Sequence, residues 1–155
     1  MADPGRESLS GSERKRLESA YLATTYRVEA QRGSIDLRVG QHCAALDRLL
    51  QRCEAKTWAF VSATNPRSMP MPAWRNRDHH LKLVQAVRAA GYPLLEGAGL
   101  PADTHWDPEP GLLIIGISRD AAGELGKRFG QLAILVGCRG GMPELLWCDG
   151  SSDAT

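Results

Sequence analysis

The sequence predicts a single α/β domain in which helices cover a sheet of mixed parallel and antiparallel strands, with an α+β arrangement as the alternative. Three observations predict it. The length, 155 residues, fits one domain. The composition, 43% hydrophobic and 24% charged, is that of an ordinary globular protein. Segments of helical and strand periodicity alternate in the order α-β-β-α-β-α-β-β-α-β-β.

The first part of the chain contains a capped helix, a hairpin, a second helix and a central strand. Ser10 and Glu13 have capping-box spacing, which indicates a helix start. A loop of hairpin length containing Gly33 separates two alternating segments. The predicted elements are a helix through about Tyr21, strands 24–30 and 35–39, a helix over 42–54 and a central strand over 57–63.

The second part begins with a loop, because three prolines within residues 66–72 exclude a helix or a central strand. Gly91 is a natural helix stop. The nearly continuous apolar run 112–117 predicts a strand covered on both faces. The predicted elements are helix 73–90, strand 92–98, strand 112–117, a helix from Ser118 or Asp120 to Phe129, strand 131–137 and edge strand 144–148.

Both ends of the chain are polar, so we expect a flexible arm over 1–12 and a flexible tail over 150–155 around one domain, 13–149. No apolar stretch is long enough for a membrane span, and the first residues lack a signal core. We therefore expect a soluble, cytoplasmic protein. The cysteines lack C-x-x-C spacing, and we predict no metal and no cofactor.

Chain order predicts that polar residues meet at one end of the sheet. Strand 57–63, helix 73–90 and strand 92–98 form a β-α-β unit, whose strands are parallel. If strand 112–117 is antiparallel to 92–98, and 131–137 is parallel to 112–117, scattered polar residues share one rim, where open α/β sheets bind ligands. The candidate ligand-binding residues are Asn65, Ser68, Asn76, Trp106, Glu109, Arg128 and Gln131.

Structural explanations exist for most of these residues. Asn65 before Pro66 can form an Asx turn, and Asn76 can be a buried amide bonded to the proline-rich loop. Glu109 is harder to explain, because a carboxylate between two prolines before a buried strand needs partners or a cavity. It is the best catalytic candidate, although no acid partner is identifiable.

A cluster of basic residues follows the central strand. A solvated helix face explains it, and so does binding of phosphate groups on a ligand or on nucleic acid. Net charge of only +1 argues against a protein built mainly to coat nucleic acid. The cluster consists of Arg67, Arg75, Arg77, His79, His80 and Lys82, opposed by Asp78 alone.

Several short motifs over about 21–148 resemble the bacterial family called domain of unknown function 3293. The motifs are Tyr21-x-x-Thr-x-Tyr26, Thr64-Asn-Pro-x-Ser68, Asn76, the Gly-x-Gly at 97–99, Trp106-x-x-Glu109, Gly116-Ile-Ser118 and Arg128-Phe-Gly-Gln-x-Ala-Ile134. The resemblance implies no particular activity for this chain. The resemblance does imply that five candidates match its motif positions: Asn65, Ser68, Asn76, Glu109 and Gln131.

Three functional hypotheses remain. The first is a binding or regulatory module that holds a small polar ligand or a partner peptide, with nearby arginines for an anionic part. The second is a small hydrolase or transferase acting on a nucleotide-like substrate, with Glu109 as base or metal ligand, which a raised Glu109 pKa would support. The third is nucleic-acid association through 67–88, with steep salt dependence. A homodimer through strand 144–148 and Trp147 stays open, and no membrane partner is expected.

Overall fold

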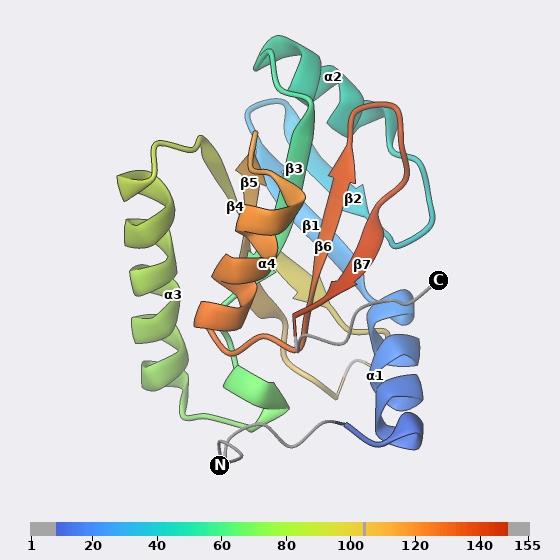
Figure 1. The fold of residues 1–155 in the computed structure, drawn as a ribbon, viewed down its shortest axis with the longest axis vertical. Helices are drawn as coiled ribbons and strands as arrows, with labels where there is room; N and C mark the ends of the chain where they lie inside the picture. Colours follow the sequence, from blue (N-terminus) through green and yellow to red (C-terminus); the bar gives the residue numbers. More distant parts are fainter. Residues whose placement is uncertain (1–8, 104, 149–155) are drawn as a thin grey trace.

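The computed structural model describes residues 9–103 and 105–148 (Figure 1). The helices are α1 (Gly11–Ala23), α2 (Ala44–Arg52), the 3-10 turn η1 (Pro66–Ser68), α3 (Ala73–Ala89) and α4 (Arg119–Arg128). The strands are β1 (Thr25–Ala30), β2 (Gly33–Leu37), β3 (Thr57–Ser62), β4 (Leu94–Leu100), β5 (Glu109–Ile115), β6 (Ala133–Cys138) and β7 (Glu144–Trp147). The predicted tail 150–155 and residues 1–8 of the predicted arm lie outside the described residues, and α1 already begins within the arm.

All seven strands form one sheet in the order β2-β1-β4-β5-β3-β6-β7, and every neighbouring pair is antiparallel. The prediction of parallel neighbours is therefore wrong. The connection β3-α3-β4 does join strands of the same direction, but β5 lies between them. Likewise β3 lies between β5 and β6, which α4 connects. These are the two interleaved crossovers of a split β-α-β arrangement.

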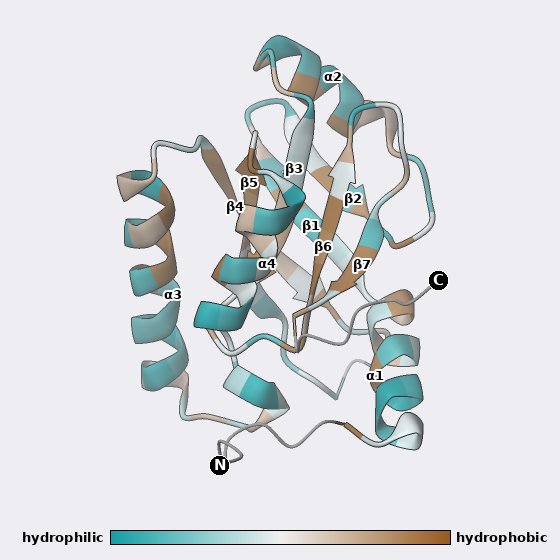
Figure 2. Cartoon of the chain, viewed as in Figure 1, coloured by the Kyte–Doolittle hydropathy of each residue, from teal (hydrophilic) through white to brown (hydrophobic). Residues whose placement is uncertain are grey.

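Helices α3 and α4 lie over one face of the central strands (Figures 1 and 2), and α2 packs against the core of the other face. Successive strand residues point to opposite faces. Val61, Leu112 and Ile114 form a core with α3 and α4, whereas Phe60 and Leu113 form a core with α2 and the β1–β2 hairpin. Residues 112–115 are all buried, which confirms the two-sided cover predicted for this strand.

The predicted caps at Ser10 and Ser118 and the predicted stop at Gly91 are confirmed, whereas the helix predicted over 42–54 spans only Ala44–Arg52. The Ser10 hydroxyl accepts the backbone N–H of Glu13, and the Ser118 hydroxyl accepts that of Ala121. Gly91 follows α3 with a φ of 85°. These caps satisfy backbone groups that the helix itself leaves unpaired.

The edge strand β7 is partly covered by α1. The ring of Tyr21 meets that of Trp147 edge-on at 6.2 Å, and the Arg14 guanidinium lies 4.5 Å from the Trp147 ring. Trp147 therefore packs within its own chain. None of the described helices has the length and apolar character that a membrane crossing requires.

Candidate functional site

The chain leaves β3 through a loop of unusual backbone conformation, residues 65–72. Asn65, Arg67 and Ser68 have φ values of 45°, 56° and 59°. Side chains other than glycine rarely occupy this region, because Cβ crowds the backbone there. The sequence predicted a stiff loop but not the turn η1 within it. Surrounding contacts must hold such a conformation in place.

Two asparagine side chains supply those contacts. The Asn76 Oδ1 on α3 accepts the backbone N–H of Asn65 at 2.9 Å, and the Asn76 Nδ2 donates to the Asn65 Oδ1 at 2.9 Å. The Asn65 Oδ1 also accepts the backbone N–H of Met71 at 3.0 Å. This reciprocal pair fixes both ends of the loop against the first turn of α3.

The end of α4 holds the other side of the loop. The backbone N–H of Arg67 donates to the Gly130 carbonyl at 2.6 Å. A Cβ on Gly130 would lie 2.7 Å from the Cβ of Pro66, so only glycine allows this approach. Gln131 Nε2 donates to the Thr64 carbonyl at 3.2 Å. Gln131 thus joins the loop, as its predicted position at the rim requires.

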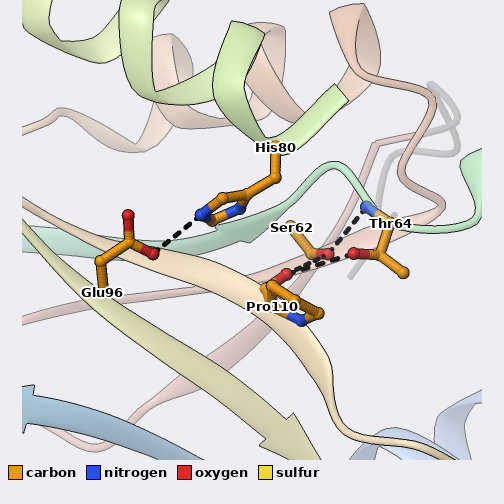
Figure 3. A network of polar contacts seen from close by, with 5 residues as sticks. All are labelled: Ser62, Thr64, His80, Glu96 and Pro110. Carbon is orange, nitrogen blue, oxygen red and sulfur yellow. Dashed lines mark hydrogen bonds and ion pairs between the residues drawn. The ribbon is translucent and has the colours of Figure 1, made fainter. Parts of the chain in front are cut away.

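A hydroxyl pair joins the end of β3 to the start of β5 (Figure 3). The Ser62 hydroxyl donates to the Pro110 carbonyl at 2.8 Å and accepts the backbone N–H of Thr64 at 3.0 Å. The Thr64 hydroxyl lies 3.4 Å from the same carbonyl. These contacts position Glu109, the residue before Pro110. Ser62 and Thr64 were not among the predicted residues, although Thr64 begins one of the motifs.

Glu109 is the carboxylate of this network. It is exposed at the start of β5, and its Oε1 accepts from Asn65 Nδ2 at 3.4 Å. Its other oxygen has no hydrogen-bond partner among residues 9–103 and 105–148. Protein atoms around the carboxyl raise its pKa by desolvation, and the bond from Asn65 opposes that rise.

The charge of Glu109 affects the pKa of two tyrosine hydroxyls, those of Tyr21 and Tyr26. Burial raises the pKa of the Tyr21 hydroxyl, and the charge of Glu109 raises it further. Burial, then Tyr21, then Glu109 raise the pKa of the Tyr26 hydroxyl. Both phenols therefore stay neutral at physiological pH. The site prediction missed them, and the Tyr21-x-x-Thr-x-Tyr26 motif was the signal that could have identified them.

The structure thus brings four predicted residues together: Asn65 bonds Asn76 and Glu109 directly, and Gln131 bonds the residue before Asn65. Ser68 is in the same loop, with an exposed side chain that has no hydrogen bond within the described chain. Trp106 is 67% exposed. The Arg128 guanidinium lies 5.4 Å from the ring centroid of Phe129.

The predicted basic cluster divides between the surface and the interior. His80 turns inward, with its Nε2 2.8 Å from the Glu96 Oε2 on β4 (Figure 3). Lys82 pairs with Asp78 one turn earlier at 3.0 Å, and Arg75 lies 5.3 Å from the ring of Trp74. The cluster is therefore not one continuous cationic surface.

A groove of about 440 Å³ lies between α3 and α4. Its lining residues are Lys82, Gln85, Ala86, Arg128 and Phe129. Within the described ranges, no group of three or more histidine, cysteine or acidic side chains is arranged to hold a metal ion.

Comparison with family models matches residues 61–134 to the family described as "Protein of unknown function (DUF3293)". The matched segment runs from β3 into β6 and contains Asn65, Asn76, Glu109 and Gln131. The predicted resemblance is confirmed over these residues. Comparison with curated proteins and with solved structures found no match.

Proposed function

We propose that this chain, whose residues 61–134 form a DUF3293 segment, is a binding module for a small polar ligand at the end of β3. The proposed site, called the Glu109 site below, consists of Glu109, Asn65, Tyr21 and Tyr26. The observation that carries the proposal is the Glu109 carboxyl, which is exposed at the rim, accepts one hydrogen bond of 3.4 Å from Asn65 and leaves its other oxygen open within the described structure. Surrounding protein atoms raise its pKa by desolvation, so a further donating partner stabilises the ionised carboxylate.

The rigid loop beside Glu109 supports the same proposal. Three residues with positive φ are held by side-chain amides from α3 and by the end of α4. Backbone strain of this kind costs about 1–3 kcal/mol per residue and is concentrated at functional positions. A loop fixed in advance also spares a ligand the entropy of ordering it.

The chemistry of the site limits the ligand class. An ionised Glu109 accepts hydrogen bonds, and the neutral tyrosine hydroxyls donate or accept them. The side-chain amide of Asn76 is already used to hold the loop. A small molecule with an amine or amide donor facing Glu109 suits this set best.

Thermal-shift screening of small amines, amides and amino acids tests the proposal. We expect a ligand that raises the melting temperature of the wild type, with a clearly smaller rise for Glu109→Gln, because the charged acceptor is lost. Glu18→Gln, an exposed carboxylate on α1, is the matched control and should respond like the wild type. A ligand that stabilises all three proteins equally binds elsewhere and contradicts the proposal.

The raised Glu109 pKa favours a second candidate, a hydrolase or transferase acting on a nucleotide-like substrate. A general base works best when its pKa approaches the working pH. The test is turnover of a panel of nucleotides by the wild type and Glu109→Gln. Loss of turnover with retained nucleotide binding would support this candidate, and turnover unchanged in Glu109→Gln would exclude Glu109 as the base.

A further inference from the structure

The groove between α3 and α4 has a chemical character unlike that of the Glu109 site. Lys82 on α3 and Arg128 on α4 supply two cationic groups from opposite walls, and no acidic side chain from residues 9–103 or 105–148 lines the groove. Phe129 and Ala86 supply apolar surface, and Gln85 an amide. The volume of about 440 Å³ is in the range of small-molecule sites.

The charged side chains of the groove remain available to a ligand. Lys82 is 61% exposed, and its only described ion pair is an exposed one with Asp78 on the same helix, a kind that contributes little energy. Arg128 is also exposed, and no carboxylate pairs with it within the described residues. Two cations on facing helices match a ligand group that carries two negative charges.

The position of Arg128 against Phe129 adds a preference for a flat ligand group. The guanidinium carbon lies over the Phe129 ring, 5.4 Å from its centroid, and the Arg128 side chain is exposed. Guanidinium planes stack readily on aromatic rings, so a planar apolar group has a platform next to the cationic groups.

We propose that the groove between α3 and α4 binds a phosphate monoester of a small planar group, with Lys82 and Arg128 holding the phosphate and Phe129 and Arg128 receiving the ring. This site is separate from the Glu109 site and does not depend on it. The two lie on different elements: Glu109 begins β5, whereas the groove is lined by α3 and the end of α4.

The test uses the full chain and three probes: phenyl phosphate, inorganic phosphate and benzyl alcohol, titrated by NMR or calorimetry. We expect saturable binding of phenyl phosphate, at least about fivefold tighter than either of the other probes, because only phenyl phosphate has both parts. Raising the salt concentration from about 50 to about 300 mM should weaken it, since exposed charges are screened.

Variants locate the bound probe. Lys82→Gln and Arg128→Gln should each weaken phenyl phosphate binding about fivefold or more, through loss of one charged contact. Asp78→Asn should strengthen it, because it releases Lys82 from its ion pair. Arg88→Gln, an exposed cation in the last turn of α3 that does not line the groove, should leave binding unchanged.

Three results would overturn the proposal: no saturable binding of phenyl phosphate by the wild type, equal affinity for phenyl and inorganic phosphate, or unchanged affinity in both Lys82→Gln and Arg128→Gln. Glu109→Gln separates the two sites. Unchanged phenyl phosphate binding in that variant supports an independent groove, and a loss comparable to that of Arg128→Gln contradicts it. Circular dichroism of each variant verifies that it is folded.

Discussion

The loop 65–72 and the groove between α3 and α4 are both polar, but their side chains use their hydrogen-bonding capacity differently. In the loop, Asn65 and Asn76 direct their amides at backbone groups and at each other, and Asn65 also donates to Glu109. In the groove, Lys82 and Arg128 are exposed and hold no other element in place. The comparison teaches that polar residues gathered at a rim can serve the fold itself, whereas Lys82 and Arg128 are not engaged in this way and suit the ligand binding proposed above.

The largest effect should come from removing the centre of the loop network. Asn76→Ala leaves the backbone N–H of Asn65 without its acceptor, which should cost about 2–3 kcal/mol. We expect the melting temperature to fall by about 5–10 °C, measured by circular dichroism. Gln85→Ala, on the exposed face of the same helix, should change stability by less than about 0.5 kcal/mol. Equal effects of the two variants would refute a structural role for Asn76.

A smaller effect should come from the contact between the loop and the end of α4. Gly130→Ala places a methyl group 2.7 Å from the Cβ of Pro66, at a φ of 71°. We expect a loss of about 1–3 kcal/mol, from overpacking and from the left-handed conformation. Gly140→Ala is the control, because it shares the positive φ but meets no atom within 4 Å. Chemical denaturation of both variants should show the larger loss for Gly130→Ala.

Glu109→Gln should raise stability slightly, whereas the two variants above lower it. The folded pKa of Glu109 is raised, so the folded state prefers the protonated carboxyl. Stability is therefore lost as pH rises from the unfolded pKa through the folded one, and the loss persists at neutral pH. The variant should melt about 1 °C higher than the wild type near pH 7, and this gain should vanish below about pH 4. A lower melting temperature at neutral pH would contradict the pKa shift.

The smallest effect is expected in the groove. Lys82→Gln and Arg128→Gln remove exposed charges, and each should alter the free energy of unfolding by less than about 0.5 kcal/mol. Thermal denaturation at two salt concentrations measures it. A large loss of stability in either variant would show that the groove side chains support the fold, as those of the loop do. It would contradict the difference drawn between the two regions.

Local sequence signals predicted the helices and strands well, because capping, glycine stops and apolar periodicity act within a few residues. Ser118, Gly91 and the run 112–117 are examples. Strand neighbours were not predictable in this way. The insertion of β5 between β3 and β4 is decided by packing over the whole sheet, so two strands of the same direction were expected to be neighbours although another strand separates them.

The candidate site was predicted in part for a related reason. Strand directions alone bring Asn65, Asn76, Glu109 and Gln131 to one rim, so their meeting could be inferred. Tyr26 lies on β1, which is the neighbour of β4 in the sheet. No feature of the sequence around β1 indicates that β4 is its neighbour, so the position of Tyr26 near Glu109 could not be predicted. Whether the residues at the rim bind a ligand stays a prediction.

The interleaved crossovers also set the order in which the chain can fold. Strand β3 pairs with β5 and β6, and Thr57 meets Cys138 near the end of the described chain. Neither neighbour of β3 is the next strand in the sequence. During synthesis, both edges of this apolar strand therefore stay unpaired until β5 and then β6 have been made. Such long-range pairing slows folding, and an unpaired apolar strand is prone to aggregation in the meantime. Among the described strands, we therefore expect residues 57–62 to be especially prone to aggregation before the chain is complete.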